Sequence, residues 1–369
     1  MTGLNIKDFL IHGAFLQIGP DLFKVFVGPF ERHDSVQKAL LKHPTLLFKP
    51  NFWDFLKYDG GLSQKAVYSA QNSALFDRED FISFLATQMS LMPKVDWAVI
   101  NESDFRSQYD WSQKNFNEES LFKAVPIIRQ HGATQFSAEN LVWCIRNLIQ
   151  LDTFGWSYGF FENRKGYIGH TPEVLAQWSR IDHQLHTVAL AGTVARSKGA
   201  EIDLLSDAKI RNEHQLVVDD VTDKLSRLSF VSKSIQGPTD VLELKYLLHL
   251  MTEFQLEAAD LDQVFEVINI LHPTSAMGIY PHNGEKLKEF SEFSLQALRS
   301  TFAAPFAVVE KDNVSCVVAI RNMFFDESKL EIFSGCGVTR DSNYEDEVIE
   351  LENKRNSVKK MMGLSYDEY

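Results

Sequence analysis

Apolar and polar residues alternate in several ways along this chain, and no single period extends over its length. The segment 23–30 (FKVFVGPF) is apolar and rich in aromatic residues, which predicts a strand that ends at a Gly-Pro turn. Over residues 140–151, apolar side chains recur three or four positions apart, as they do on one face of a helix. Ser137 precedes this pattern and is expected to cap the helix.

Similar patterns predict further elements of both kinds. Short β-rich runs cover residues 153–162, 186–191 and 315–321, and longer patterns predict helices over 201–228 and 344–362. Strands and helices mixed without a regular βαβ order predict an α+β fold rather than a doubly wound parallel sheet. Because no Pro-rich or Ser/Gly-rich linker interrupts the chain, we expect residues 1–369 to form a single large domain.

The last predicted helix carries charged residues at meaningful spacing. Glu347, Glu350 and Lys354 stand at i, i+3 and i+7, so they share one helix face. Two carboxylates there could bind a hard divalent cation, although a solvated ion-pair face is the commoner explanation. In the other long helix, Glu213 and His214 point about 100° apart and cannot chelate one metal together.

Composition narrows the class of protein. The chain has 37 basic and 50 acidic residues and a net charge of −13, which argues against a nucleic-acid partner. Its three cysteines are far apart and without CxxC spacing, as expected in a reducing compartment. We find neither a signal peptide nor an apolar run long enough to span a membrane. We therefore expect a cytoplasmic protein without a membrane partner, and a monomer.

Several short motifs, taken in order, resemble the chorismate-utilising enzymes, the family of anthranilate, aminodeoxychorismate, isochorismate and salicylate synthases. Each motif is weak alone, but their order and spacing make the resemblance specific over residues 121–364, whereas residues 1–115 match less clearly. The motifs are FKAVPIIR (122–129), GHTPE (169–173), LAGT (190–193), AKIRNEHQLVV (208–218), LHL (248–250), LHPTSAMGIYP (271–281), VAIR (318–321), GCGV (335–338) and ELENK (350–354).

The resemblance implies a fold and a cofactor. The fold would be one α+β domain of stacked antiparallel sheets with helices packed outside. The cofactor would be Mg²⁺, which holds the ring carboxylate of chorismate and prefers oxygen ligands together with several waters. By resemblance, Glu213 and Glu350 would be metal ligands, and Glu347 would reach the metal directly or through water.

The resemblance also assigns the chemistry. Family members that take ammonia from a glutaminase subunit usually carry glutamine where this chain has Lys123, so no glutaminase partner is expected. Aminodeoxychorismate synthases carry a nucleophilic lysine where this chain has Ala191, which leaves water as the nucleophile. Lys123 would be the general base that activates this water for attack on ring C2, and Glu173 would protonate the departing C4 hydroxyl. A carboxyl group can act in this way only if its pKa is raised.

Other residues would bind the substrate. Arg321 would hold the enolpyruvyl carboxylate, because a guanidinium group fits a carboxylate with two hydrogen bonds. Further residues would supplement this contact or line the ring and metal side, and His249 would pack nearby without a catalytic role. These further residues are Lys354, the backbone N–H groups of Gly335 and Gly337, Gly192, Thr193, His272 and Ala276.

Three functions remain open at this level. Ala276 stands where salicylate synthases usually carry threonine, which favours an isochorismate synthase of the kind found in menaquinone and siderophore biosynthesis. A salicylate synthase, which also eliminates pyruvate, is the alternative. The third possibility is a chorismate-binding protein with weak or no catalysis, because Phe302, Ala304 and Ala307 replace a tyrosine and two glycines of the family pattern.

Overall fold

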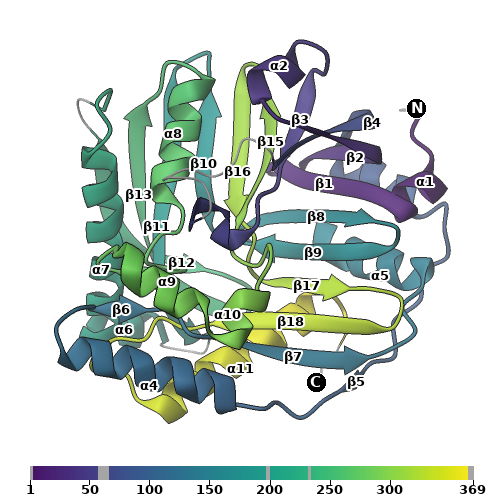
Figure 1. The fold of residues 1–369 in the computed structure, drawn as a ribbon. Coiled ribbons are helices and arrows are strands. Elements are labelled where there is room, and N and C mark those ends of the chain that lie inside the picture. Colours follow the sequence, from purple (N-terminus) through teal and green to yellow (C-terminus); the bar gives the residue numbers. More distant parts are fainter. Residues whose placement is uncertain (1–2, 57–65, 197–199, 232–233, 365–369) are drawn as a thin grey trace.

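The strands of the computed structural model form one long, curled antiparallel sheet (Figure 1). The structure describes residues 3–56, 66–196, 200–231 and 234–364, and within these ranges 16 strands follow the order β12-β13-β11-β10-β16-β15-β3-β4-β2-β1-β8-β9-β17-β18-β7-β5, while β14 and β6 form a separate pair. Their bounds are β1 His12–Gly19, β2 Leu22–His33, β3 Thr45–Phe48, β4 Val67–Asp77, β5 Asp96–Trp97, β6 Lys123–Ala124, β7 Ile127–Ala133, β8 Trp156–Glu162, β9 Lys165–Thr171, β10 Val174–Ser179, β11 Gln184–Ala195, β12 Ile235–Glu243, β13 Leu247–Glu257, β14 Ile279–Tyr280, β15 Pro305–Glu310, β16 Asn313–Val318, β17 Asn322–Phe325 and β18 Lys329–Gly335.

The sheet bends so that its two halves face each other. In Figure 1, β10, β16 and β15 run upright, whereas β1, β8 and β9 run across the view. The ring of Phe306 on β15 lies 5.6 Å from that of Tyr158 on β8 and 6.1 Å from that of Tyr167 on β9. The predicted stacked sheets are therefore confirmed, as the halves of one continuous sheet with an aromatic core between them.

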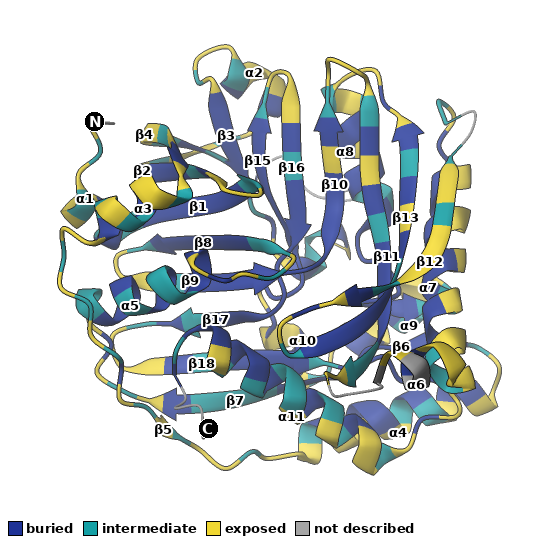
Figure 2. Ribbon diagram, turned by 180° about the vertical axis from the view of Figure 1, so that it is seen from behind, coloured by how far each residue is buried: buried dark blue, intermediate teal, exposed yellow. Residues whose placement is uncertain are grey.

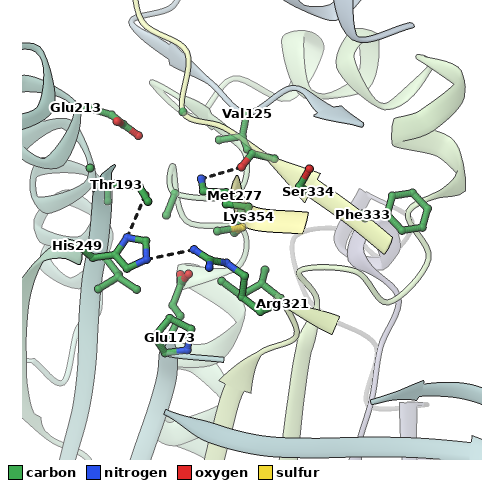
Figure 3. A pocket seen from close by; sticks show the side chains of 18 of the residues that line it. Val125, Glu173, Thr193, Glu213, His249, Met277, Arg321, Phe333, Ser334 and Lys354 are labelled. Atoms are coloured by element: carbon green, nitrogen blue, oxygen red, sulfur yellow. Dashed lines mark hydrogen bonds between the residues drawn. The ribbon is translucent and has the colours of Figure 1, made fainter. Parts of the chain in front are cut away.

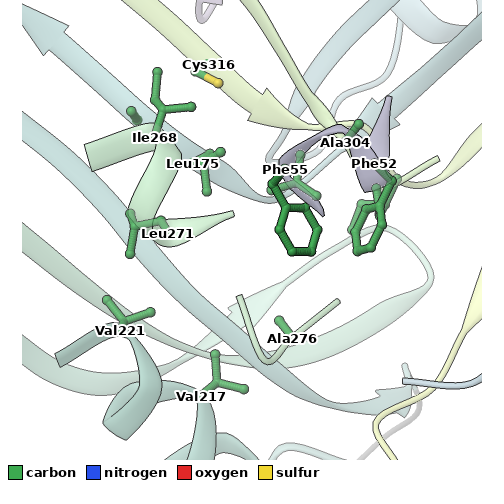
Figure 4. Packing of buried hydrophobic residues seen from close by; sticks show 14 of the residues in the cluster. Phe52, Phe55, Leu175, Val217, Val221, Ile268, Leu271, Ala276, Ala304 and Cys316 are labelled. Carbon is green, nitrogen blue, oxygen red and sulfur yellow. The ribbon is translucent and has the colours of Figure 1, made fainter. Parts of the chain in front are cut away.

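Helices cover the outer faces of both halves, as predicted (Figures 1 and 2). Val217 and Val221 of α7, Ile268 of α8 and Leu175 of β10 belong to one buried hydrophobic cluster (Figure 4). No helix in the described ranges is long and apolar enough to cross a membrane. The helices are α1 Ile6–Ile11, α2 Val36–Leu40, the 3₁₀ helix η1 Phe52–Leu56, α3 Arg78–Leu85, α4 Ser103–Asn117, α5 Ala138–Ile149, α6 Ala200–Ser206, α7 Ala208–Ser226, α8 Leu261–Leu271, α9 Gly284–Ser291, α10 Ser294–Leu298 and α11 Tyr344–Met361.

Two local predictions were wrong. The strand at residues 23–30 does not end at Gly28-Pro29 but continues as β2 to His33, because a shift of register between Val27 and Phe30 accommodates the proline as a bulge. The long helix expected over 201–228 is split into α6 and α7 at Asp207. The Asp207 side chain accepts a hydrogen bond from the Ile210 amide and so starts a new helix.

Candidate active site

A cavity of about 660 Å³, including its opening, lies where these elements converge (Figure 3). The sheet and helices bring together segments that are more than 200 residues apart in the sequence, from β6 to α11. Ten of the residues expected at the site line this cavity: Lys123, Glu173, Gly192, Thr193, Glu213, Ala276, Arg321, Gly335, Gly337 and Lys354.

Lys123 and Glu213 form a buried ion pair at this cavity. Lys123 lies on the short strand β6 and is 1% exposed, and its Nζ is 3.0 Å from Glu213 Oε1 on α7. Gly337 passes directly beside the pair. A Cβ at this position would overlap Glu213 Oε1 and lie 2.8 Å from Lys123 Cε. A side chain at position 337 would therefore displace the Glu213 carboxylate from its place beside Lys123.

Glu173 lies in the connection between β9 and β10, and its side chain points into the cavity (Figure 3). Burial raises its pKa to about 8, although the positive charges of Lys123, Lys354 and Arg321 oppose this shift. Its Oε2 is buried without a hydrogen-bond partner. At neutral pH the side chain is therefore mainly a neutral carboxylic acid, the form that can donate a proton.

Arg321 is held by two neutral groups. Its guanidinium group lies 3.1 Å from His249 Nε2 and 3.3 Å from the Ser357 hydroxyl. Burial and the nearby charge of Arg321 hold the pKa of His249 well below its usual value, so the imidazole is neutral. Because the guanidinium donates to Nε2, Nδ1 carries the ring proton and donates to Thr193 Oγ1 at 3.0 Å (Figure 3). The sequence placed His249 nearby but did not reveal this link between Thr193 and Arg321.

Lys354 projects from α11 beside the same cavity. Its Nζ lies 2.5 Å from Glu350 Oε1 and donates to the Gly335 carbonyl at 2.9 Å. Gly335 therefore contributes its carbonyl oxygen to Lys354 in addition to lining the cavity. With Arg321, Lys354 makes this side of the cavity cationic, as the binding of a carboxylate requires.

Of the three carboxylates expected to hold a metal, only Glu213 lines the cavity itself. Glu350 lines an adjoining cavity together with Glu213 and Thr193. Burial raises the pKa of Glu350, Lys354 opposes this, and the negative charges of Glu347 and Glu213 raise it further. Glu347 is 1% exposed, with Oε1 2.8 Å from Lys209 Nζ and Oε2 without a hydrogen-bond partner. Mutually repelling carboxylates and a buried oxygen without a partner fit a cation with oxygen ligands.

The spacing of these carboxylates also bears on how a metal would be held. They do not form a group whose ligand atoms all lie within 4.8 Å of one another; in the described part of the chain, only Glu31, His33 and His43 do. A Mg²⁺ ion that retains several waters would fit this wider spacing.

One expected site residue lies elsewhere. His272 does not line the cavity; it ends α8, and its Nε2 lies 2.9 Å from the Phe52 carbonyl, between the rings of Phe52 and Phe55. Burial lowers its pKa to about 3, so the ring is neutral. The prediction that His272 lines the ring and metal side of the site is not met in this structure, because the backbone turns this side chain into the core.

The residues that depart from the family pattern have different surroundings. Phe302 lines the cavity, and its ring is stacked on Phe333 at 5.4 Å. Ala304 and Ala307 are buried outside the cavity and lack the positive φ that would favour glycine, whereas Ala303 has φ 61°. Of the three departures, only Phe302 changes the surface of the site. Sequence reasoning missed several other lining residues: Val125, Pro172, Leu190, Met277, Arg299, Ile320, Phe333 and Ser334.

Several known proteins are similar to this chain in sequence and in fold. The salicylate biosynthesis isochorismate synthase of Pseudomonas aeruginosa is 30% identical over 220 residues, covering 55% of this chain and 45% of that protein. Isochorismate synthase MenF of Escherichia coli is 25% identical over 368 residues, covering 91% of this chain and 83% of MenF. The structure of the menaquinone-specific MenF from E. coli superposes with a TM-score of 0.77 and 17% identity, over 98% of this chain and 92% of that one.

The extent of these matches differs between relatives. The chain spans about half the length of the P. aeruginosa relative and of Bacillus subtilis MenF, namely 45% and 57%. The family described as chorismate binding enzyme matches residues 73–363, which is most of the chain. This protein therefore belongs to the chorismate binding enzyme family.

Proposed function

We propose that this protein is an isochorismate synthase that isomerises chorismate to isochorismate with the help of Mg²⁺. The observation that carries the proposal is one cavity with both a buried lysine, Lys123, and a carboxyl group whose pKa is raised to about 8, Glu173. Ala191 also lines the cavity and offers no nucleophile. Relatives named for salicylate, menaquinone and vibriobactin biosynthesis are all described as isochorismate synthases, which supports the same reaction here.

The residues would divide the reaction between them. Lys123 would act as the general base and take a proton from water as the water oxygen bonds to ring C2. Glu173 would give its proton to the hydroxyl that leaves C4 as water, so atoms and charge balance over the isomerisation. Arg321 and Lys354 would hold the enolpyruvyl carboxylate.

Glu213, Glu350 and Glu347 would hold the metal. Bound Mg²⁺ would supply positive charge for the ring carboxylate of chorismate. In this structure Lys209 pairs with Glu347 and Lys354 pairs with Glu350, so both carboxylates lie beside a positive charge.

A salicylate synthase remains the alternative, since it would use the same base and acid before eliminating pyruvate. Ala276 lines the cavity with a methyl group, where the salicylate enzymes usually place a threonine hydroxyl. The position therefore favours release of isochorismate. A chorismate-binding protein with weak catalysis is favoured only by Phe302, which replaces the usual tyrosine at the cavity wall.

The test is incubation of the purified protein with chorismate and Mg²⁺, followed by chromatographic separation of the products. Isochorismate alone supports the proposal, and salicylate with pyruvate favours the alternative. Chorismate binding in calorimetry without turnover favours the third function. Parallel reactions with a chelator and with Lys123→Met separate metal-dependent enzymatic turnover from spontaneous decay of chorismate.

A further inference from the structure

Two histidines and a glutamate meet near α2, in the part of the fold drawn at the top of Figure 1. Glu31 and His33 are two residues apart on β2, so their side chains leave the same face of the strand. His43 follows α2, where its amide donates to the Ala39 carbonyl at 2.9 Å. The ligand atoms of Glu31, His33 and His43 all lie within 4.8 Å of one another.

A neighbouring hydroxyl orients one of the imidazoles. His33 Nε2 lies 2.8 Å from the hydroxyl of Ser69, which is buried on β4. Ser69 is also the residue that pairs with Glu31 across the sheet. With Nε2 donating to this hydroxyl, the lone pair of Nδ1 is left to bind a metal, the arrangement that fixes histidine ligands in many metal sites.

We propose that Glu31, His33 and His43 bind one Zn²⁺ ion, whose fourth position is left to water. Two imidazole nitrogens and one carboxylate oxygen form a donor set typical of Zn²⁺, whereas Mg²⁺ prefers oxygen ligands alone.

The geometry needs only a small adjustment. In a tetrahedral site with bonds of about 2.0–2.2 Å, neighbouring ligand atoms are about 3.4 Å apart. The distances between the ligand atoms must therefore shorten by at most about 1.4 Å. Glu31 is exposed and both rings are only half-buried, so rotation of these side chains supplies this movement.

The bound ion would connect two segments of the fold. It would tie the end of β2 to the turn after α2 that leads into β3. This zinc site shares no residue with the chorismate cavity, so it does not depend on the function proposed above.

The test is titration of Zn²⁺ into untagged, chelator-treated protein, in competition with a chromogenic zinc chelator. We expect one ion per chain, affinity at least 100-fold weaker in His33→Ala and His43→Ala, and about tenfold weaker in Ser69→Ala. His186→Ala, which removes an exposed histidine on β11, is the matched control and should bind as the original protein does.

Two further measurements make the result decisive. X-ray absorption at the zinc edge should show the outer scattering of imidazole rings, and Zn²⁺ should raise the melting temperature of the original protein but not of His33→Ala. Glu350→Gln should keep the zinc affinity. Equal binding by the original protein and His33→Ala, or loss of binding in Glu350→Gln, would overturn the proposal, and thermal unfolding without zinc shows whether each variant is folded.

Discussion

Replacement of the buried acid Glu173 by its neutral amide should make the protein more stable while strongly lowering its turnover. The pKa of Glu173 is raised from 4.5 to about 8, so between these values the folded state binds a proton that the unfolded state has lost. Stability therefore falls as pH rises through this window, by about 1.4 kcal/mol for each pH unit. At pH 7, which is 2.5 units above 4.5, the accumulated loss is about 3 kcal/mol. Glu173→Gln has nothing to ionise and should recover this amount.

The assay is equilibrium unfolding in urea of the original protein and Glu173→Gln at several pH values between 5 and 7.5. The difference in unfolding free energy should grow from below about 1 kcal/mol at pH 5 to about 3 kcal/mol at pH 7. Comparing the two proteins cancels the titration of histidines that they share. Glu257→Gln, at an exposed position on β13, is the matched control and should show no such trend.

Two results would refute this reasoning. A difference that does not change with pH would mean that Glu173 does not bind an extra proton in the folded state. Turnover of chorismate by Glu173→Gln at the original rate would mean that it is not the proton donor, because an amide cannot supply that proton; loss of about 10²–10⁴-fold is expected.

Three further substitutions test the rest of the site. Lys123→Met should lower kcat by about 10²–10⁴-fold, since it removes the proposed base; unchanged steady-state kinetics would exclude that role. Gly337→Ala should lower kcat/KM by about 10²-fold, because the new methyl displaces Glu213, whereas Gly284→Ala, with nothing within 4 Å of the added methyl, should not. Arg321→Lys should raise KM for chorismate about tenfold or more with less effect on kcat, because an ammonium cannot form the two parallel hydrogen bonds; an unchanged KM would contradict its contact with the carboxylate.

The sequence correctly predicted where a helix begins when hydrogen bonds between neighbouring residues fix that position. Ser137 caps α5 through a reciprocal hydrogen-bond pair with Asn140, and α11 begins at Tyr344 as expected. Where short-range signals compete, the pattern misled: Asp207 serves as a cap inside a continuous helical pattern, and Pro29 is accommodated by a bulge rather than ending its strand. Cross-strand pairing supplies the free energy for such a bulge, and pairing partners are not visible along one strand.

The motifs identified many of the site residues, because their order along the chain matched a known family, and ten of the residues predicted from them line one cavity. Only the tertiary structure decided how these residues act. Burial, which raises the pKa of Glu173 to about 8, depends on side chains from distant strands, and so does the hydrogen-bonded series from Thr193 through His249 to Arg321. The same motif predicted both Ala276 and His272 at the site, but only Ala276 lines the cavity. Backbone direction at the end of α8 turns that ring toward Phe52, and this direction is set by packing between segments more than 200 residues apart.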